Sequence, residues 1–203
     1  AGGNIYLLIA GGALASFILG MGMAVTAVYV ILALFVAPVL TTQGLDPLAV
    51  HMFILYTAML SFITPPVAVA AFVAAPIAGA SAMKVGIRAC QIGVAKFFVP
   101  FFFVLNPALI LHGDLLEVVE AVVTSVIGLS LVGLAIEGYL WGIGKVRSRW
   151  ARVALFVAGI LMTIPGWRTD LIGFVSAALI IAGLKIAERK RREGKIPAIQ
   201  NAS

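Results

Sequence analysis

Charge is scarce in this chain of 203 residues. Charged residues make up only 11% of it, whereas hydrophobic residues make up 63%. This amount of polar surface is too small to cover a soluble domain. Lipid must therefore solvate much of the chain. Several apolar stretches approach the roughly 20 residues that a helix needs to cross a bilayer. The composition therefore excludes an ordinary soluble domain and predicts an all-α polytopic membrane protein in the cell (inner or plasma) membrane.

Residue types that carry catalysis or bind transition metals are also rare. The chain has one cysteine and two histidines, and Asp46 is the sole acidic residue before Lys84. A single cysteine excludes an internal disulfide and a cysteine-based metal cluster. The sequence contains no phosphate-binding loop, catalytic triad or metal-ligand cluster. We therefore expect neither an enzyme nor a bound cofactor.

The positive charge is concentrated in three short segments, 84–96, 145–152 and 185–195. The turns near Asp114 and residue 165 lack this bias. An excess of lysine and arginine marks cytoplasmic loops, so we place the three basic segments inside and both turns outside. The net charge of +6 thus indicates membrane orientation and not a nucleic-acid partner.

Two adjacent prolines interrupt an apolar, uncharged region. Pro65 and Pro66 lie within the sequence SFITPPV of residues 61–67. Because each proline lacks an N–H and clashes with the preceding turn, no intact helix passes through them. We expect a broken helix over 47–77. Backbone broken at membrane depth is tolerated only where protein buries it or where it lines a wet cavity, and secondary transporters build their sites this way.

A second irregular region precedes the prolines. Apolar limbs at 5–19 and 24–40 flank the uncharged sequence GMGM of residues 20–23. Because neither limb is long and no polar loop separates them, we predict a re-entrant helical hairpin over 5–40. The alternatives are one continuous helix softened by glycine, or two ordinary spans joined by a tight turn.

The rest of the chain predicts further membrane segments. Residues 80–91 carry Lys84 and Arg88 and are expected to form an interfacial helix. Residues 92–111 are expected to form a full span rich in phenylalanine, bent at Pro100 and Pro107. Residues 113–203 predict a C-terminal membrane extension with a basic cytoplasmic tail. Its expected spans are 115–140, 153–164 and 171–187. The last two are short, so a partly inserted hairpin is an alternative.

Five motifs, taken in order, carry a resemblance to a known family. They are LGMGMAVTAVY at 19–29, HMFILY at 51–56, MLSFITPPV at 59–67, MKVG at 83–86 and FFFVLNPA at 101–108. The chain resembles the large membrane subunit of tripartite ATP-independent periplasmic (TRAP) transporters, most closely the type with small and large permease subunits fused. The similar region covers roughly residues 4–112.

The resemblance implies both architecture and partners. The family's large subunit has two inverted repeats, each with a re-entrant hairpin and a broken helix, and residues 1–112 look like the second repeat only. The missing small subunit and first repeat are then expected partners. The family imports organic acids with sodium and receives them from a soluble periplasmic binding protein. Residues 113–203 resemble the C-terminal extension of fused members.

The candidate site combines hydroxyl groups with freed carbonyls. Sodium needs about five or six hard oxygen ligands, which unwound backbone and hydroxyls can supply. We expect Ser61 and Thr64 to bind Na⁺. The full candidate sodium and substrate set is Gly20, Met21, Gly22, Thr26, Ser61, Thr64, Pro65, Pro66 and Val67.

These residues can also have purely structural roles. The hydroxyls of Ser61 and Thr64 can instead satisfy carbonyls of their own kinked helix. His51 is a candidate proton or substrate contact, although a histidine near a helix start is more often satisfied locally. For the whole chain, the leading hypothesis is the permease component of a secondary transporter, and the alternative is a membrane scaffold or assembly subunit that does not transport.

Overall fold

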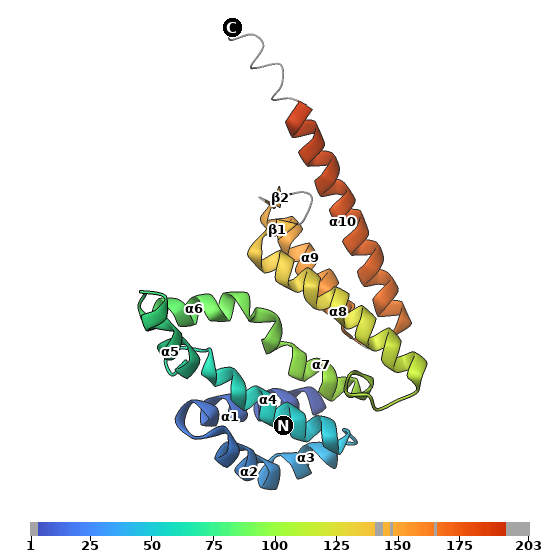
Figure 1. Cartoon of the computed structure of the whole chain (residues 1–203). Helices are drawn as coiled ribbons and strands as arrows, with labels where there is room; N and C mark the ends of the chain where they lie inside the picture. Colours follow the sequence, from blue (N-terminus) through green and yellow to red (C-terminus); the bar gives the residue numbers. More distant parts are fainter. Residues whose placement is uncertain (1–3, 141–143, 147, 165, 194–203) are drawn as a thin grey trace. The chain divides into compact units, whose positions relative to one another are not determined.

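The computed structural model describes residues 4–140, 144–146, 148–164 and 166–193. The predicted all-α polytopic membrane fold is confirmed, since α-helices form nearly all regular structure in these residues, apart from one pair of two-residue strands (Figure 1). The chain divides into two compact units, Ala1–Val122 and Val123–Ser203. The end of the expected basic tail, residues 194–203, lies outside the described residues.

The first unit is built from short helices with frequent interruptions. Its elements are α1 (Ile5–Gly22), α2 (Val25–Phe35), α3 (Ala37–Thr41), α4 (Pro47–Met59), η1 (Leu60–Phe62), α5 (Val69–Ile77), α6 (Ala82–Ile92), η2 (Val94–Phe97), α7 (Val99–Leu105) and η3 (Pro107–Ile110).

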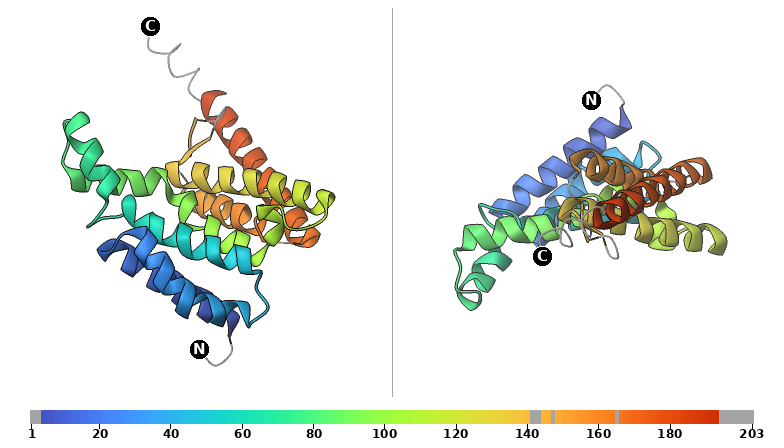
Figure 2. Two further views of the ribbon diagram at one scale, coloured as in Figure 1. Left: turned by 60° about the horizontal axis from the view of Figure 1, so that its bottom comes forward. Right: turned by 90° about the horizontal axis from the view of Figure 1, so that it is seen from above.

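Helices α1 and α2 form a hairpin that packs on α4. The N-terminal half of α1 faces the end of α2 and α3, around Gly12, Val36 and Leu40. Both limbs contribute to one apolar core with α4, in which Val28 and Phe53 are fully buried. The three helices lie side by side (Figure 1 and the left panel of Figure 2). The core thereby fixes the hairpin against the helix that leads to the prolines.

The hairpin turns later than the sequence predicted. We expected the turn at Gly20–Met23, but α1 continues through Gly22, and Met23 and Ala24 make the turn with extended backbone. Gly20 stays helical because it packs directly on α4, where a close approach needs glycine. With 18 residues and an apolar sequence, α1 is long enough to cross a membrane, whereas the 11 residues of α2 are not.

The span expected over 92–111, with bends at Pro100 and Pro107, is divided more strongly in the structure than the sequence predicted. The structure has three short pieces there, η2, α7 and η3, because prolines repeatedly interrupt the helical hydrogen bonds. Pro100 occupies the start of α7, and Pro107 starts η3, with Asn106 capping the Ala108 amide at 3.2 Å. Helices α5 and α6 are also bent, by 114° to each other.

The second unit contains longer helices. They are α8 (Leu115–Glu137), which begins in the first unit, α9 (Arg149–Leu161) and α10 (Trp167–Glu193), with strands β1 (Tyr139–Leu140) and β2 (Gly144–Lys145) pairing antiparallel between α8 and α9. Helix α9 contacts α8 where Gly128 meets Gly159, and contacts α10 where Gly173 meets Met162.

Three described helices are long and apolar enough to cross a membrane: α1, α8 and the Arg168–Ile186 part of α10. The bent pair α5 and α6 counts as a fourth if the two helices together form one broken span. The 13 residues of α9 are too few to cross a membrane alone, and this helix begins earlier, at Arg149, than the span expected at 153–164. Its start is fixed by Ser148, whose hydroxyl accepts a hydrogen bond from the Ala151 amide.

Candidate functional site

The helix that starts at Pro47 ends before the two prolines, and the chain is irregular from Ile63 to Ala68. Pro65 and Pro66 are joined by a cis peptide bond, and Ala68 has a φ of 34°, in the left-handed region. The Ala68 amide bonds the Thr64 carbonyl at 3.0 Å, which closes the turn before α5. We call residues 61–68 the break.

Several carbonyls of the break are left without helical partners. The left-handed backbone at Ala68 turns the chain, so the amides that follow it do not bond to the carbonyls that precede it. The carbonyls of Pro65, Pro66 and Val67 accept no hydrogen bond from any described residue. Three hard oxygens in consecutive residues are thus available for a cation or for water.

The two predicted hydroxyl ligands lie at the start of this break. Ser61 is fully buried and donates to the Ala58 carbonyl at 2.8 Å, while half-buried Thr64 donates to the Leu60 carbonyl at 2.8 Å. Both hydroxyl protons therefore satisfy backbone carbonyls of the same helix, which is the structural role considered above as the alternative to sodium binding. A hydroxyl that donates still has lone pairs with which to accept. Both oxygens consequently remain suitable cation ligands.

The end of α1 reaches the same place. A Cβ on Gly20 would lie 2.5 Å from the Ala58 carbonyl oxygen, the atom that accepts the Ser61 proton. The structure thus brings Gly20 and Ser61 together on one carbonyl. No side chain fits between these two helices, so glycine is required at this position.

The other predicted residues of the hairpin lie farther along the chain. Met21 is half-buried and Gly22 is exposed, with open space around its Cα. Thr26 is exposed on the first turn of α2, and no described contact joins it to Ser61 or Thr64. Of the hairpin candidates, Gly20 lies directly against the helix that leads into the break.

Helix α6 packs against the break with a face of small residues. A Cβ on Gly86 would lie 3.0 Å from the Pro65 ring, and one on Gly93 would lie 3.2 Å from the Ile63 side chain. Between them, the Cys90 thiol donates to the Ile63 carbonyl at 3.2 Å and lies 3.8 Å from the Thr64 hydroxyl. These contacts hold the break in place.

Sequence reasoning missed this role of α6. Lys84 and Arg88 indicated a surface helix, and both side chains are indeed exposed. The small residues at 86, 90 and 93 are spaced four and three apart, so they share one helix face on the other side. That spacing is the signal in the sequence that predicts a packed face.

His51 is paired within the protein. Its Nδ1 lies 3.1 Å from the hydroxyl of Tyr29 on α2, and the two rings meet edge to face. This contact ties α2 to α4 more than two turns before the break. The described contacts of His51 therefore support a local, structural role for this residue.

Asp46 caps α4 at the opposite end from the break. One carboxylate oxygen accepts from the Ala49 amide at 2.9 Å, and the other lies 2.9 Å from His112 Nδ1. The Ala49 amide, followed by His112, lowers the pKa of Asp46 below its ordinary value. The carboxylate is thus a structural cap, and the described residues contain no cluster of three or more His, Cys, Asp or Glu side chains for a metal.

Comparison with known families decides the identity of the first unit. Residues 1–118 match the family "Tripartite ATP-independent periplasmic transporter, DctM component". The chain belongs to this family. It is therefore a TRAP transporter permease component, and the TRAP match spans the hairpin, the break and α6 but ends near the start of α8. Comparisons with curated proteins and with solved structures found no match.

Membership places the described geometry in a membrane transporter. TRAP permeases are membrane components that work with a substrate-binding protein and a small permease subunit. The hairpin and the break lie in the matched region, and the three candidate spans agree with a membrane location. Residues 119–203 lie outside the match, so family membership assigns them no role.

Proposed function

We propose that this TRAP permease imports carboxylates with sodium, at a site formed by the break and the end of the hairpin. Ser61 and Thr64 bind Na⁺ through their hydroxyl oxygens, together with freed carbonyls of the break. The chain acts as part of a multi-pass inner-membrane permease. A soluble binding protein delivers the substrate, and a small subunit and a first repeat complete the transporter.

The observation that carries this proposal is a set of free oxygens in a stretch of sequence, 47–113, that contains no acidic residue. Asp46 is the sole acid before Lys84 and lies at the far end of α4, so a cation at the break meets neutral ligands. Its positive charge is then not cancelled by the protein. An anionic substrate supplies the missing charge, which makes binding of the two mutually favourable. Charge compensation of this kind supports coupled import.

The start of α5 supports the same assignment. This nine-residue helix begins at Val69, directly after the break, and its first amides have no intrahelical partners. A helix N-terminus carries partial positive charge and favours anions. A carboxylate near these amides would lie close to the sodium ligands.

Replacement of Thr64 tests the sodium role. Thr64→Val keeps the shape of the side chain but removes an oxygen ligand. We expect the half-saturating sodium concentration for uptake to rise about tenfold, a change of kcal/mol scale. Sodium titrations of uptake by the intact permease in proteoliposomes measure this. Thr64→Ser, which retains the hydroxyl, is expected to stay near wild type.

The sodium response also separates this role from a purely structural one. If the Thr64 hydroxyl only satisfies the Leu60 carbonyl, Thr64→Val lowers stability and maximal uptake without moving the sodium dependence. A folded Thr64→Val protein with an unchanged half-saturating sodium concentration therefore rejects Thr64 as a ligand.

Dependence on a binding protein is a separate test. Uptake by the intact permease is measured with and without its soluble binding protein, at saturating sodium. We expect little uptake without it, because the proposed site receives substrate by transfer and not by direct capture. Equal uptake in both conditions would show a conventional symporter.

A further inference from the structure

A pocket of about 430 Å³ lies in the second unit, outside the family match. It is formed where the end of α8 meets the start of α9. Its lining residues are Ala135, Ile136, Arg149, Arg152, Val153 and Phe156. This volume lies within the range of pockets that hold small ligands in proteins.

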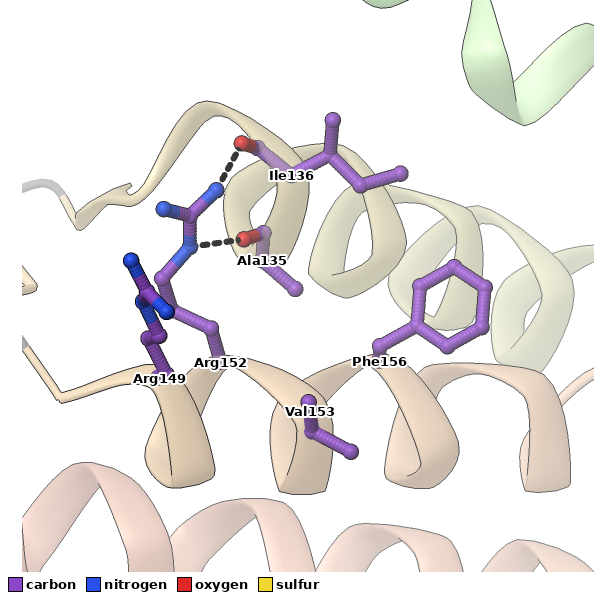
Figure 3. A pocket seen from close by; sticks show the side chains of 6 residues that line it. All are labelled: Ala135, Ile136, Arg149, Arg152, Val153 and Phe156. Carbon is purple, nitrogen blue, oxygen red and sulfur yellow. Dashed lines mark hydrogen bonds between the residues drawn. The ribbon is translucent and has the colours of Figure 1, made fainter.

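The pocket has a cationic end and an apolar end. The guanidinium groups of Arg149 and Arg152 lie together on one side, and the ring of Phe156 lies at the other, with Val153 between (Figure 3). A ligand that fits this lining has an anionic group joined to an apolar body.

The two arginines have different roles. Arg152 donates from Nε to the Ala135 carbonyl at 2.7 Å and from Nη2 to the Ile136 carbonyl, so it caps the end of α8. Arg149 is exposed, and no hydrogen bond or ion pair engages its side chain within the described residues. Its donors are available for a ligand. Glu137, the nearest acid along the chain, is exposed and does not line the pocket.

The pocket lies beside the end of a candidate membrane span. The apolar span of α8 ends at Glu137, directly after two residues that line the pocket. Trp150, next to Arg149, is 84% exposed, as expected of an aromatic anchor at the boundary between lipid and water. The sequence from Lys145 to Arg152 carries four positive charges, which favours the cytoplasmic side.

We propose that this pocket binds an acidic phospholipid of the cytoplasmic leaflet. The phosphate pairs with the Arg149 guanidinium, and an acyl chain lies along Val153 and Phe156. Basic pockets between helices on the cytoplasmic side are suited to anionic headgroups. The bound lipid joins the start of α9 to the end of α8, at the place where Arg152 already links them.

Lipid titration of the detergent-solubilised intact protein tests the proposal. Native mass spectrometry measures the fraction of protein that carries phosphatidylglycerol or, for comparison, phosphatidylcholine. We expect phosphatidylglycerol to bind more tightly, and Arg149→Gln to weaken that binding about fivefold. Lys84→Gln removes one charge from another exposed basic segment and is expected to change it less than twofold. Equal binding of the two lipids, or no effect of Arg149→Gln, overturns the proposal.

Two further arms distinguish a lipid from a soluble anion. Val153→Gln removes the apolar wall, and we expect it to weaken phosphatidylglycerol binding while Arg149 is intact. Inorganic phosphate is expected to compete poorly, because it gains nothing from the apolar end. Unchanged lipid binding by Val153→Gln, or efficient displacement by inorganic phosphate, would show a simple anion site and contradict the lipid assignment.

Discussion

The two units of the chain differ in the continuity of their helices. In the first, the helix from Pro47 breaks before Val69 and leaves three consecutive carbonyls without partners. In the second, α8 and α10 run unbroken for 23 and 27 residues, and Arg152 caps the end of α8. Unsatisfied backbone groups are costly in lipid. A helix break therefore persists in a membrane only where protein buries it or where it lines a water-filled cavity. The difference is consistent with the proposal that ions and substrate bind in the first unit, whereas the second unit is a packed membrane element.

Glycine serves close packing in both units, but with different neighbours. Gly128 and Gly159 face each other, so two continuous helices touch backbone to backbone. In the first unit, Gly20 packs on the helix end that leads into the break. Substitutions at matched glycines can therefore separate packing from transport.

The largest loss of stability is expected for Gly128→Ala. The added Cβ would lie 2.5 Å from the Gly159 carbonyl oxygen, which is fixed backbone, so α8 and α9 must separate. Overpacking of this kind costs about 1–3 kcal/mol or more. Thermal unfolding of the detergent-solubilised protein measures the loss.

Gly133→Ala is the matched control for that change. It lies in the same helix with nothing within 4 Å of the added Cβ, and alanine is the better helix former. We expect a neutral or slightly higher melting temperature. Equal melting temperatures for the two variants would mean that the contact between Gly128 and Gly159 is not as close as described.

A smaller effect is expected at the cap of α4. The pKa of Asp46 is lowered in the folded protein, so this carboxylate adds stability above its ordinary pKa of 3.8, which is lost as the pH falls through the folded value. Asp46→Asn retains a capping side chain but removes the titration. We expect wild type to lose more melting temperature than Asp46→Asn between pH 6 and about pH 3. Parallel losses would show that this carboxylate does not contribute.

The break was predictable because the chemistry of proline is local. Pro65 and Pro66 remove hydrogen-bond donors wherever they stand, and two such residues in apolar sequence predict a break without knowledge of the fold. The apolar run from residue 115 predicted a long helix in the same way, and α8 begins there. Helix α10 is longer than the span expected at 171–187, and the prolines near residue 100 interrupted the span over 92–111 more than expected.

What was missed depends on tertiary contacts. Gly20 was expected in a turn, since glycine favours turns, but packing on Ala58 keeps it inside a helix. Cys90 gave no sign of its bond to the Ile63 carbonyl, because the partner lies 27 residues away. The charges of Lys84 and Arg88 indicated a surface helix and did not reveal the small-residue face of α6. Such contacts join distant segments, and single-sequence patterns do not specify which segments meet.

The central claim, that the hairpin end and the break act as one sodium-dependent site, is tested most directly at Gly20. Gly20→Ala pushes the end of α1 away from the Ala58 carbonyl, whereas Gly11→Ala, on the same helix with nothing within 4 Å of the added Cβ, does not. Sodium titrations of uptake are run on both variants of the intact permease in proteoliposomes. We predict that Gly20→Ala raises the half-saturating sodium concentration by about tenfold, a loss of about 1.4 kcal/mol, while Gly11→Ala stays within about twofold. Sodium dependence that is the same in both folded variants would contradict the account.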